Sequence, residues 1–416
     1  MQWEAAERMQ DRFPFSAYLA ARVLISLADT MLTVTIGWHL YQYSGNPFDL
    51  ALVGLMQILP MLCLFIVTGW VVDHFPRNKI LIICAILEAV TYLGLAISMQ
   101  DGELDKVMIF SLLFLHGCAR AFNSPALQAI LPNIVSKEFL SRAVALTSAM
   151  WTTASTAGPF IAGLMIAWVD FRTYWILVAL SSLGAVCYFL LPKLPTSRPL
   201  GRGWKDLLSG IHYVMASPIV LPSISLDLFI VLLGSVVALL PVYVIDVLGV
   251  GPEALGMLRA MPALGGVMMG LTLAKLPPLR QAGKHLFFSL LVFSGSILVF
   301  AFSDKLWLSL AALWVYGAAD MVSVNIRLTL IQLATPDELR GRVSAVNMLF
   351  IGASNELGDF RAGSVSALFG PVATVILGAC MAFGVTAGGY LLCTRLRRLD
   401  RLTDVEVEAG AELARQ

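Results

Sequence analysis

The chain repeats itself at a spacing of 200 residues, and this repeat limits its possible folds more than any other feature. Arg120 aligns with Asp320, and the same shift superposes Gly117 on Gly317, Glu138 on Glu338, Arg142 on Arg342, Gly158 on Gly358 and Gly163 on Gly363. Arg120 and Asp320 each lie deep in an apolar run. An ionisable group there costs roughly 2.5–3.5 kcal/mol on insertion, so it should face a bundle interior and mark a functional pathway. Two copies of one membrane unit with central polar groups predict a transporter.

Composition supports the membrane assignment. Hydrophobic residues make up 58% of the chain and charged residues 13%, and the mean hydropathy is +0.81. A helix needs about 20 mostly apolar residues to cross the hydrocarbon core. Twelve segments qualify and predict an all-α integral membrane protein with twelve transmembrane helices: 16–42, 50–72, 79–99, 106–131, 139–168, 172–192, 218–246, 253–275, 284–302, 306–331, 342–366 and 371–394.

The repeat divides the chain into two six-helix bundles with pseudo-two-fold symmetry, at 1–192 and 218–394, followed by a cytoplasmic tail at 395–416. The connection at 193–217 begins with prolines and continues into an amphipathic segment. Helical spacing there puts these apolar residues on one face: Leu207, Leu208, Ile211, Val214 and Met215. Such a face predicts a helix that lies on the inner membrane surface.

The positive charges predict the orientation. Most of the 28 lysines and arginines fall in segments that are cytoplasmic if the N-terminus is cytoplasmic, including Arg77, Lys79, Arg142 and Arg340. By the positive-inside rule, both termini are then expected inside. The first fifteen residues lack the apolar stretch and cleavage site of a signal peptide. The six cysteines lack metal-site spacing, and we expect them to be apolar packing residues that bind no metal.

The connection between the second and third segments carries the sharpest local motif. Gly69, Asp73, Arg77 and Lys79 follow a GxxxDxxxRxK spacing, which closely resembles the signature of the major facilitator superfamily. The resemblance implies a conformational latch that holds an outward-facing state. In this interpretation Gly69 allows close helix approach, Asp73 complements the positive end of a helix, and Arg77 and Lys79 anchor the cytoplasmic edge. The alternative is a basic loop that only sets the topology.

The fifth segment contains a run of small residues around a proline. Gly158, Pro159 and Gly163 resemble the GPxxGG element of exporters in this superfamily, with Ala162 in place of one glycine. Small residues beside a proline suit a bent helix that packs closely against a neighbour. The resemblance implies export rather than import. Ordinary helix packing is the alternative.

The whole chain resembles the branch of the superfamily that contains enterobactin exporters and macrolide-type efflux proteins. The segments that carry the resemblance lie in both halves: Pro60, 37–41 (GWHLY), 120–125 (RAFNSP), 131–135 (LPNIV) and 334–343 (ATPDELRGRV). Most of them lie at helix junctions and packing surfaces. They therefore indicate the branch better than the substrate.

In the superfamily fold, the first, fourth, seventh and tenth helices line a central cavity. The resemblance places these polar residues there: Asp29, Arg120, Asp227 and Asp320, with Asn123 and Asn325 as hydrogen-bonding neighbours. A carboxylate that alternates between a proton-bound and a salt-bridged state can carry a proton. We expect Asp29 to be the carrier, followed by Asp320 and then Asp227. Arg120 is expected to be a charge partner or to bind an anionic substrate. A static interhelical salt bridge is the alternative.

Two further charge groups lie inside predicted spans. In the eleventh span, Glu356 and Asp359 share a helix face, and Arg361 or Arg259 can neutralise them. An outer gate and a buried ionic cluster are equally compatible with this pattern. Glu88 lies near the middle of the third span, where it either meets a polar neighbour or is protonated.

Together these patterns predict a secondary transporter: a proton-coupled exporter (antiporter) of small amphipathic molecules, such as drugs or siderophores, that works by alternating access in the bacterial inner membrane. No Walker A sequence for ATP binding is present, and we expect no enzymatic activity, cofactor or nucleic-acid partner. The expected partners are the substrate, protons and lipid, and the expected state is a monomer. A transporter-like receptor or scaffold without net flux is one alternative, and a lysophospholipid flippase is another.

Overall fold

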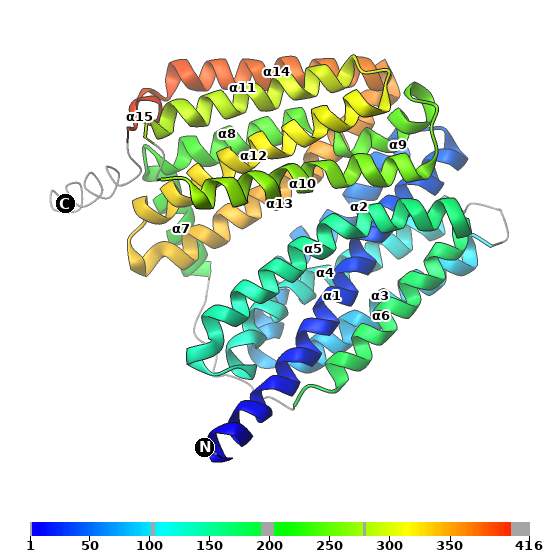
Figure 1. Cartoon of the computed structure of the whole chain (residues 1–416), viewed down its shortest axis with the longest axis vertical. Coiled ribbons are helices and arrows are strands. Elements are labelled where there is room, and N and C mark those ends of the chain that lie inside the picture. The colour runs from blue at the N-terminus through cyan, green and yellow to red at the C-terminus, as the bar shows by residue number, and fades with distance from the viewer. Residues whose placement is uncertain (1, 101–104, 193–203, 278–279, 401–416) are drawn as a thin grey trace. The chain divides into compact units, whose positions relative to one another are not determined.

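The computed structural model describes residues 2–100, 105–192, 204–277 and 280–400, and these ranges contain helices and no strands (Figure 1). The α-helices are α1 (Gln2–Ser44), α2 (Pro47–His74), α3 (Arg77–Ser98), α4 (Lys106–Ile134), α5 (Lys137–Val169), α6 (Thr173–Phe189), α7 (Trp204–Ala216), α8 (Val220–Gly234), α9 (Leu240–Val242), α10 (Pro252–Lys275), α11 (Ala282–Ala301), α12 (Leu306–Ala334), α13 (Asp337–Phe369), α14 (Pro371–Leu392) and α15 (Thr394–Arg398). Two 3₁₀ helices, η1 (Asp170–Arg172) and η2 (Val237–Leu239), and a π-helix, η3 (Tyr243–Val247), complete the list.

The helix bounds confirm the internal repeat. α4 and α12 begin and end 200 residues apart, and so do α5 and α13. Equivalent glycines also make equivalent contacts. A Cβ atom on Gly117 would lie 2.7 Å from the carbonyl oxygen of Gln57 and 3.0 Å from Cγ of Pro60, and a Cβ atom on Gly317 would collide with Pro262. In both copies, therefore, a helix that contains a proline packs directly against a glycine.

Contacts divide the chain into two compact units. Unit 1 comprises 1–45, 52–200 and 250–257, and unit 2 comprises 46–51, 201–249 and 258–416. The expected boundaries at 192 and 218 differ from this division, because the first turns of α2 and α10 are exchanged. Close contacts explain the exchange. A Cβ atom on Gly163 of α5 would lie 2.7 Å from the carbonyl oxygen of Pro252, and one on Gly363 of α13 would lie 2.8 Å from Cβ of Ala51.

Ten stretches among the described helices are long and apolar enough to cross a membrane. One of them, Phe139–Phe189, covers most of α5 and all of α6. α13 is not among them, because polar residues such as Asn347, Glu356 and Asp359 lower its hydropathy. The structure therefore shows a helical protein with many membrane spans, and the number twelve remains a prediction.

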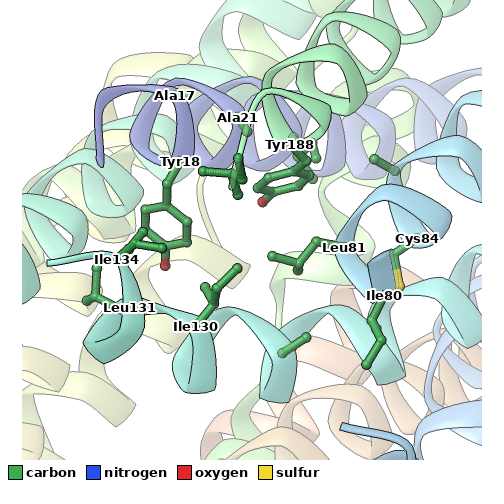
Figure 2. Close-up of a cluster of buried hydrophobic side chains, with 14 of the residues drawn as sticks. Ala17, Tyr18, Ala21, Ile80, Leu81, Cys84, Ile130, Leu131, Ile134 and Tyr188 are labelled. Carbon is green, nitrogen blue, oxygen red and sulfur yellow. The ribbon is translucent and has the colours of Figure 1, made fainter. Parts of the chain in front are cut away.

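The apolar core of unit 1 lies between α1, α3, α4 and α6. Figure 2 shows Tyr18 and Ala21 of α1, Leu81 of α3, Ile130 of α4 and Tyr188 of α6 around one interior. Each of these side chains is less than a tenth exposed. The hydroxyl of Tyr18 also donates a hydrogen bond to the carbonyl oxygen of Leu127 at 3.2 Å. This core holds α3 against α4, and both helices carry residues of the polar site described below.

The predicted surface helix is α7, and it packs within unit 2 instead of only resting on a membrane. Arg342 of α13 donates a hydrogen bond from Nη1 to Oγ of Ser209 at 3.0 Å, and the Tyr213 hydroxyl donates to the carbonyl of Ala334. Val214 is buried as expected, whereas Met215 is 62% exposed. The side chains of Leu207 and Leu208 lie outside the described residues. These hydrogen bonds attach α7 to α12 and α13, which the one-dimensional pattern did not predict.

Candidate functional site

Asp29 of α1 meets two aromatic side chains from neighbouring helices of unit 1. The hydroxyl of Tyr92 on α3 donates a hydrogen bond to Oδ1 of Asp29 at 2.9 Å, and Nε2 of His116 on α4 lies 3.7 Å from the same oxygen. The Tyr92 and His116 rings lie 5.7 Å apart. The Asp29 side chain is 24% exposed, whereas His116 is 1% exposed. Asp29 is therefore a partly exposed carboxylate that buried polar groups hold in place.

The sequence pattern indicates Asp29 as a site residue but does not indicate Tyr92 or His116. His116 lies one helical turn before Arg120 in the same apolar helix, so it shares a face with a predicted site residue. That spacing was a usable signal. Tyr92 gave none, because a tyrosine in an apolar helix is ordinary and its partner lies on a different helix.

Arg120, on the same helix as His116, is exposed and hydrogen-bonds within unit 1. Its Nη1 donates to Oε1 of Gln57 at 3.0 Å, and Gln57 itself is buried. The positive charge of Arg120 also acts on Asp29. Arg120 and Asp320, the repeat-related pair of opposite charges, belong to different units. The partners described for each of them come from its own unit.

In unit 2, Asp227 of α8 aligns with Asp29 at an offset of 198 residues, and it has a permanent cation as partner. Its Oδ2 lies 2.6 Å from Nη1 of Arg327 on α12, and the two side chains are 11% and 5% exposed. Nε of Arg327 donates a further hydrogen bond to Oγ of Ser323 at 3.1 Å. Asp320 lies within electrostatic range of both Asp227 and Arg327. Since arginine stays protonated, Asp227 is held in an ion pair, whereas Asp29 accepts its hydrogen bond from a neutral phenol.

The role of Arg327 was missed at the sequence level. Its repeat equivalent is Leu127. The available signal was that a charged residue in one copy aligns with an apolar residue in the other. It did not identify Asp227 as the partner, because that depends on the packing of α8 against α12.

The two predicted cavity asparagines are not equivalent. Asn325 is exposed on α12. Asn123 is 6% exposed and donates a hydrogen bond from Nδ2 to Oε1 of Glu88 at 3.5 Å. Asn123 therefore faces the wholly buried Glu88 of α3 inside unit 1, and its role in a central cavity stays a prediction.

The residues of the predicted latch have separate local roles. Nη1 of Arg77 donates to the carbonyl oxygen of Ala129 at 2.8 Å and so ties the start of α3 to α4. Lys79 is exposed. Asp73 lies in the last turn of α2, the negative end of its own helix, and its side chain is outside the described residues. A Cβ atom on Gly69 would meet no described atom within 4 Å, and the expected close helix approach at this glycine stays a prediction.

The glycines of the fifth-helix motif lie at close contacts. A Cβ atom on Gly158 would collide with Oγ1 of Thr30 on α1, and one on Gly163 would lie 2.8 Å from Cα of Gly256. Pro159 lies inside α5, which continues through it. These contacts support close packing as the reason for the small residues.

Two charged residues of α13, Asp359 and Arg361, lie where the seventh predicted span is interrupted. α8 ends at Gly234, because Ser235 is extended. Oγ of Ser235 donates to Oδ1 of Asp359 at 2.5 Å. Arg361 donates from Nε to the carbonyl oxygen of Leu232 at 2.9 Å and from Nη2 to that of Ser235 at 3.4 Å. Arg361 therefore satisfies carbonyls that the end of a helix leaves without partners.

Arg259 completes this charged cluster in unit 2. Its charge acts on both Asp359 and Glu356. Arg259 was one of the two neutralising partners expected from the sequence, and Arg361 was the other. Among the described residues, no group of three His, Cys, Asp or Glu side chains is suited to a metal ion.

The chain folds as two repeated units of apolar helices with polar residues placed inside them. Solved transporters share this fold. A bacterial homologue of the human lysosomal transporter Spinster, in an inward-facing and occupied conformation, matches with a TM-score of 0.75 at 13% identity, over 94% of this chain and 99% of that chain. The nucleoside transporter NupG matches with a TM-score of 0.73 at 13% identity, over 91% and 98%.

The family model MFS_3, described as transmembrane secretion effector, matches residues 12–410, and the chain belongs to this family. Its curated relatives include the enterobactin exporter EntS of Shigella boydii serotype 18, which is 25% identical over 399 residues and 95% of each chain. EntS of Escherichia coli O1:K1 is 24% identical over the same shares. The predicted superfamily and branch are confirmed. The protein is a multi-pass membrane transporter and not an enzyme.

Proposed function

We propose that the chain is a proton-coupled exporter of the bacterial inner membrane that moves a small amphipathic molecule of the siderophore class outward in exchange for protons. The secretion-effector family and the enterobactin exporters among its relatives support outward transport. One observation carries the proton coupling: Asp29 is a partly exposed carboxylate, hydrogen-bonded by Tyr92 and 3.7 Å from His116.

Asp29 suits the role of proton carrier because its charge acts on Arg120, whose positive charge could bind an anionic substrate. The Asp29 carboxylate and the Arg120 guanidinium interact electrostatically. When Asp29 binds a proton, this attraction is lost and the Arg120 charge is available to an anionic group of the substrate. Asp227 is less suitable, because a proton there would have to displace the Arg327 guanidinium at 2.6 Å. Asp320 ranks between them in this proposal.

The membrane potential is a sufficient driving force. Moving one charge through 100 mV supplies about 2.3 kcal/mol. Since about 1.4 kcal/mol corresponds to a tenfold concentration ratio, one proton per cycle supports roughly a 50-fold gradient.

The remaining features fit a conformational cycle. We infer that Arg77 and Lys79 lie on the cytoplasmic side with both termini, where Arg77 secures α3 to α4. The cluster of Asp359, Arg361 and Glu356 would act as a gate at the outer end of the transport pathway, because Asp359 and Arg361 hydrogen-bond to residues at the break after α8. A monomer contains all of these elements.

The test uses enterobactin as the probe, in a producing bacterial host that lacks its own exporter. Mass spectrometry compares enterobactin in cells and medium for wild type, Asp29→Asn and a control, Asp105→Asn, with and without a protonophore. Asp105 caps α4 through Val107 and Met108, and asparagine caps equally well. The proposal predicts export by wild type and the control only, and only without the protonophore.

Other outcomes separate the alternatives. Export by Asp29→Asn equal to wild type would exclude Asp29 as the carrier. Binding of enterobactin without accumulation in the medium would indicate a receptor or scaffold. Movement of lysophospholipid analogues in place of enterobactin would indicate a flippase.

A further inference from the structure

Glu88 is a buried carboxyl group that the proposed carrier does not use. It lies on α3 with no solvent exposure, and its Oε1 accepts a hydrogen bond from Nδ2 of Asn123 on α4 at 3.5 Å. Among the described atoms, its second oxygen, Oε2, has no hydrogen-bonding partner, and neither has Oδ1 of Asn123. Two atoms without partners thus belong to the same pair of side chains.

A proton on Glu88 would give both Oε2 of Glu88 and Oδ1 of Asn123 a hydrogen-bonding partner. An ionised carboxylate is only an acceptor, and so is the amide oxygen of Asn123. A neutral carboxylic acid also donates, so Oε2 can donate to Oδ1 of Asn123 while Oε1 accepts from Nδ2. This double pairing satisfies both side chains. An ionised Glu88 would instead be a buried charge with one long hydrogen bond from a neutral amide, which is costly even with the positive charge of Arg120 nearby.

The second copy of the repeat shows that the packing of this helix pair, α3 against α4, does not need a carboxyl group. A shift of 201 residues aligns Glu88 with Ser289, Tyr92 with Phe293 and Gly94 with Gly295, and a shift of 200 aligns His116 with Tyr316. The ring pairs confirm this alignment: Tyr92 and His116 lie 5.7 Å apart, and Phe293 and Tyr316 lie 4.3 Å apart.

Ser289 shows what the helix pair requires at this position. It is buried, and its hydroxyl donates to the carbonyl oxygen of Leu286 in its own helix. It therefore makes no carboxyl–amide pair with α12, yet α11 and α12 pack closely. Glu88 thus adds a chemical group to unit 1 that the fold does not require.

The surroundings of Glu88 connect it to Asp29. Its titratable or charged neighbours come from four helices: Asp29, Cys84, Tyr92, Arg120 and Tyr188. Tyr92 lies one turn beyond Glu88 on the same face of α3, and its hydroxyl reaches Oδ1 of Asp29. Charges on Glu88 and Asp29 repel each other, so the two carboxyls are not ionised independently.

We propose that Glu88 and Asn123 form a second proton-binding site in unit 1, which holds a proton as a neutral acid and exchanges it with Asp29. In the exchange, the O–H bond of Glu88 breaks and an O–H bond forms on the Asp29 carboxylate, so one proton and one negative charge are shared between two groups. Asp29, whose side chain is 24% exposed, exchanges the proton with water. The role in transport rests on the function proposed above, whereas the bound proton is a property of the resting protein.

Infrared difference spectroscopy of the purified full chain in lipid nanodiscs tests the bound proton directly. Wild type should show the C=O band of a buried carboxylic acid at neutral pH. Glu88→Gln should lose this band, because its amide keeps both hydrogen bonds to Asn123 and carries no acid proton. Asp29→Asn should keep the band, and Asn123→Leu should shift it. If no such band exists, or if Glu88→Gln retains it, the proposal is overturned.

Transport through the same variants tests the exchange. Glu88→Gln should remain folded and lose gradient-driven enterobactin export. Glu88→Ser, which copies Ser289 of unit 2, is a second variant that should fold without the acid. Export by Glu88→Gln equal to wild type overturns the exchange while the proposed function stands. If wild-type export itself does not respond to a protonophore, the proposed function fails, and the infrared band alone then decides whether Glu88 binds a proton.

Discussion

Replacing Asp227 by asparagine removes one charge from the ion pair inside unit 2. Both side chains are nearly buried, at 11% and 5% exposure, and their charged atoms are 2.6 Å apart. Removing one partner of a buried pair costs about 3–5 kcal/mol, because the other charge is left uncompensated. Asp320 remains within electrostatic range of Arg327, and the new amide can still accept a hydrogen bond. We therefore expect a loss near the lower limit, about 3 kcal/mol of unfolding free energy.

The reverse substitution should cost more. Arg327→Met leaves Asp227 and Asp320 near one another without their cation, so we expect about 5 kcal/mol. The double variant Asp227→Asn/Arg327→Met removes both charges and should be more stable than Arg327→Met alone. Asp29→Asn is the matched control in unit 1. Asp29 is partly exposed and keeps its hydrogen bond from Tyr92, so the expected loss is about 1 kcal/mol.

Titration of the purified protein with a denaturing detergent in mixed micelles, followed by circular dichroism, measures these differences. The expected order of stability is wild type, Asp29→Asn, Asp227→Asn and then Arg327→Met. If Asp227→Asn unfolds at the same detergent fraction as Asp29→Asn, the ion pair does not hold α8 against α12. A double variant less stable than Arg327→Met would also refute the reasoning.

Two further substitutions test the packing of the helices. Gly117→Leu should reduce the yield of folded protein severely, because its Cβ atom would lie 2.7 Å from the carbonyl oxygen of Gln57. Gly69→Leu should give the wild-type yield, because no described atom lies within 4 Å of a Cβ atom at that position. Size-exclusion chromatography compares the yields of the two variants. Arg361→Met removes two hydrogen bonds to carbonyls at the end of α8 and should cost about 1–3 kcal/mol in the same detergent titration, and an unchanged midpoint would show that these carbonyls find other partners.

The repeat and the class of protein were predictable from the sequence, because both depend on properties that are local along the chain. Apolar runs of about 20 residues have few alternatives to a membrane helix. A glycine or a charge at a fixed spacing marks equivalent helices, as Gly117 and Gly317 do. The same logic identified Asp29 and Asp227 as polar residues inside spans. None of these inferences required knowledge of which helices are neighbours.

The partners of these residues were decided by the tertiary structure. Periodicity shows which face of a helix a residue occupies, but the opposing residue depends on how a second helix is shifted and rotated against it. For this reason the sequence did not pair Arg327 with Asp227, Tyr92 with Asp29 or Asn123 with Glu88. It also left Glu88 open between a polar contact and a protonated acid. Only the packing of α3 against α4 brings the Asn123 amide to that carboxyl group. The sequence thus determined which apolar helices carry charged residues, and the tertiary structure decided which of these residues are paired.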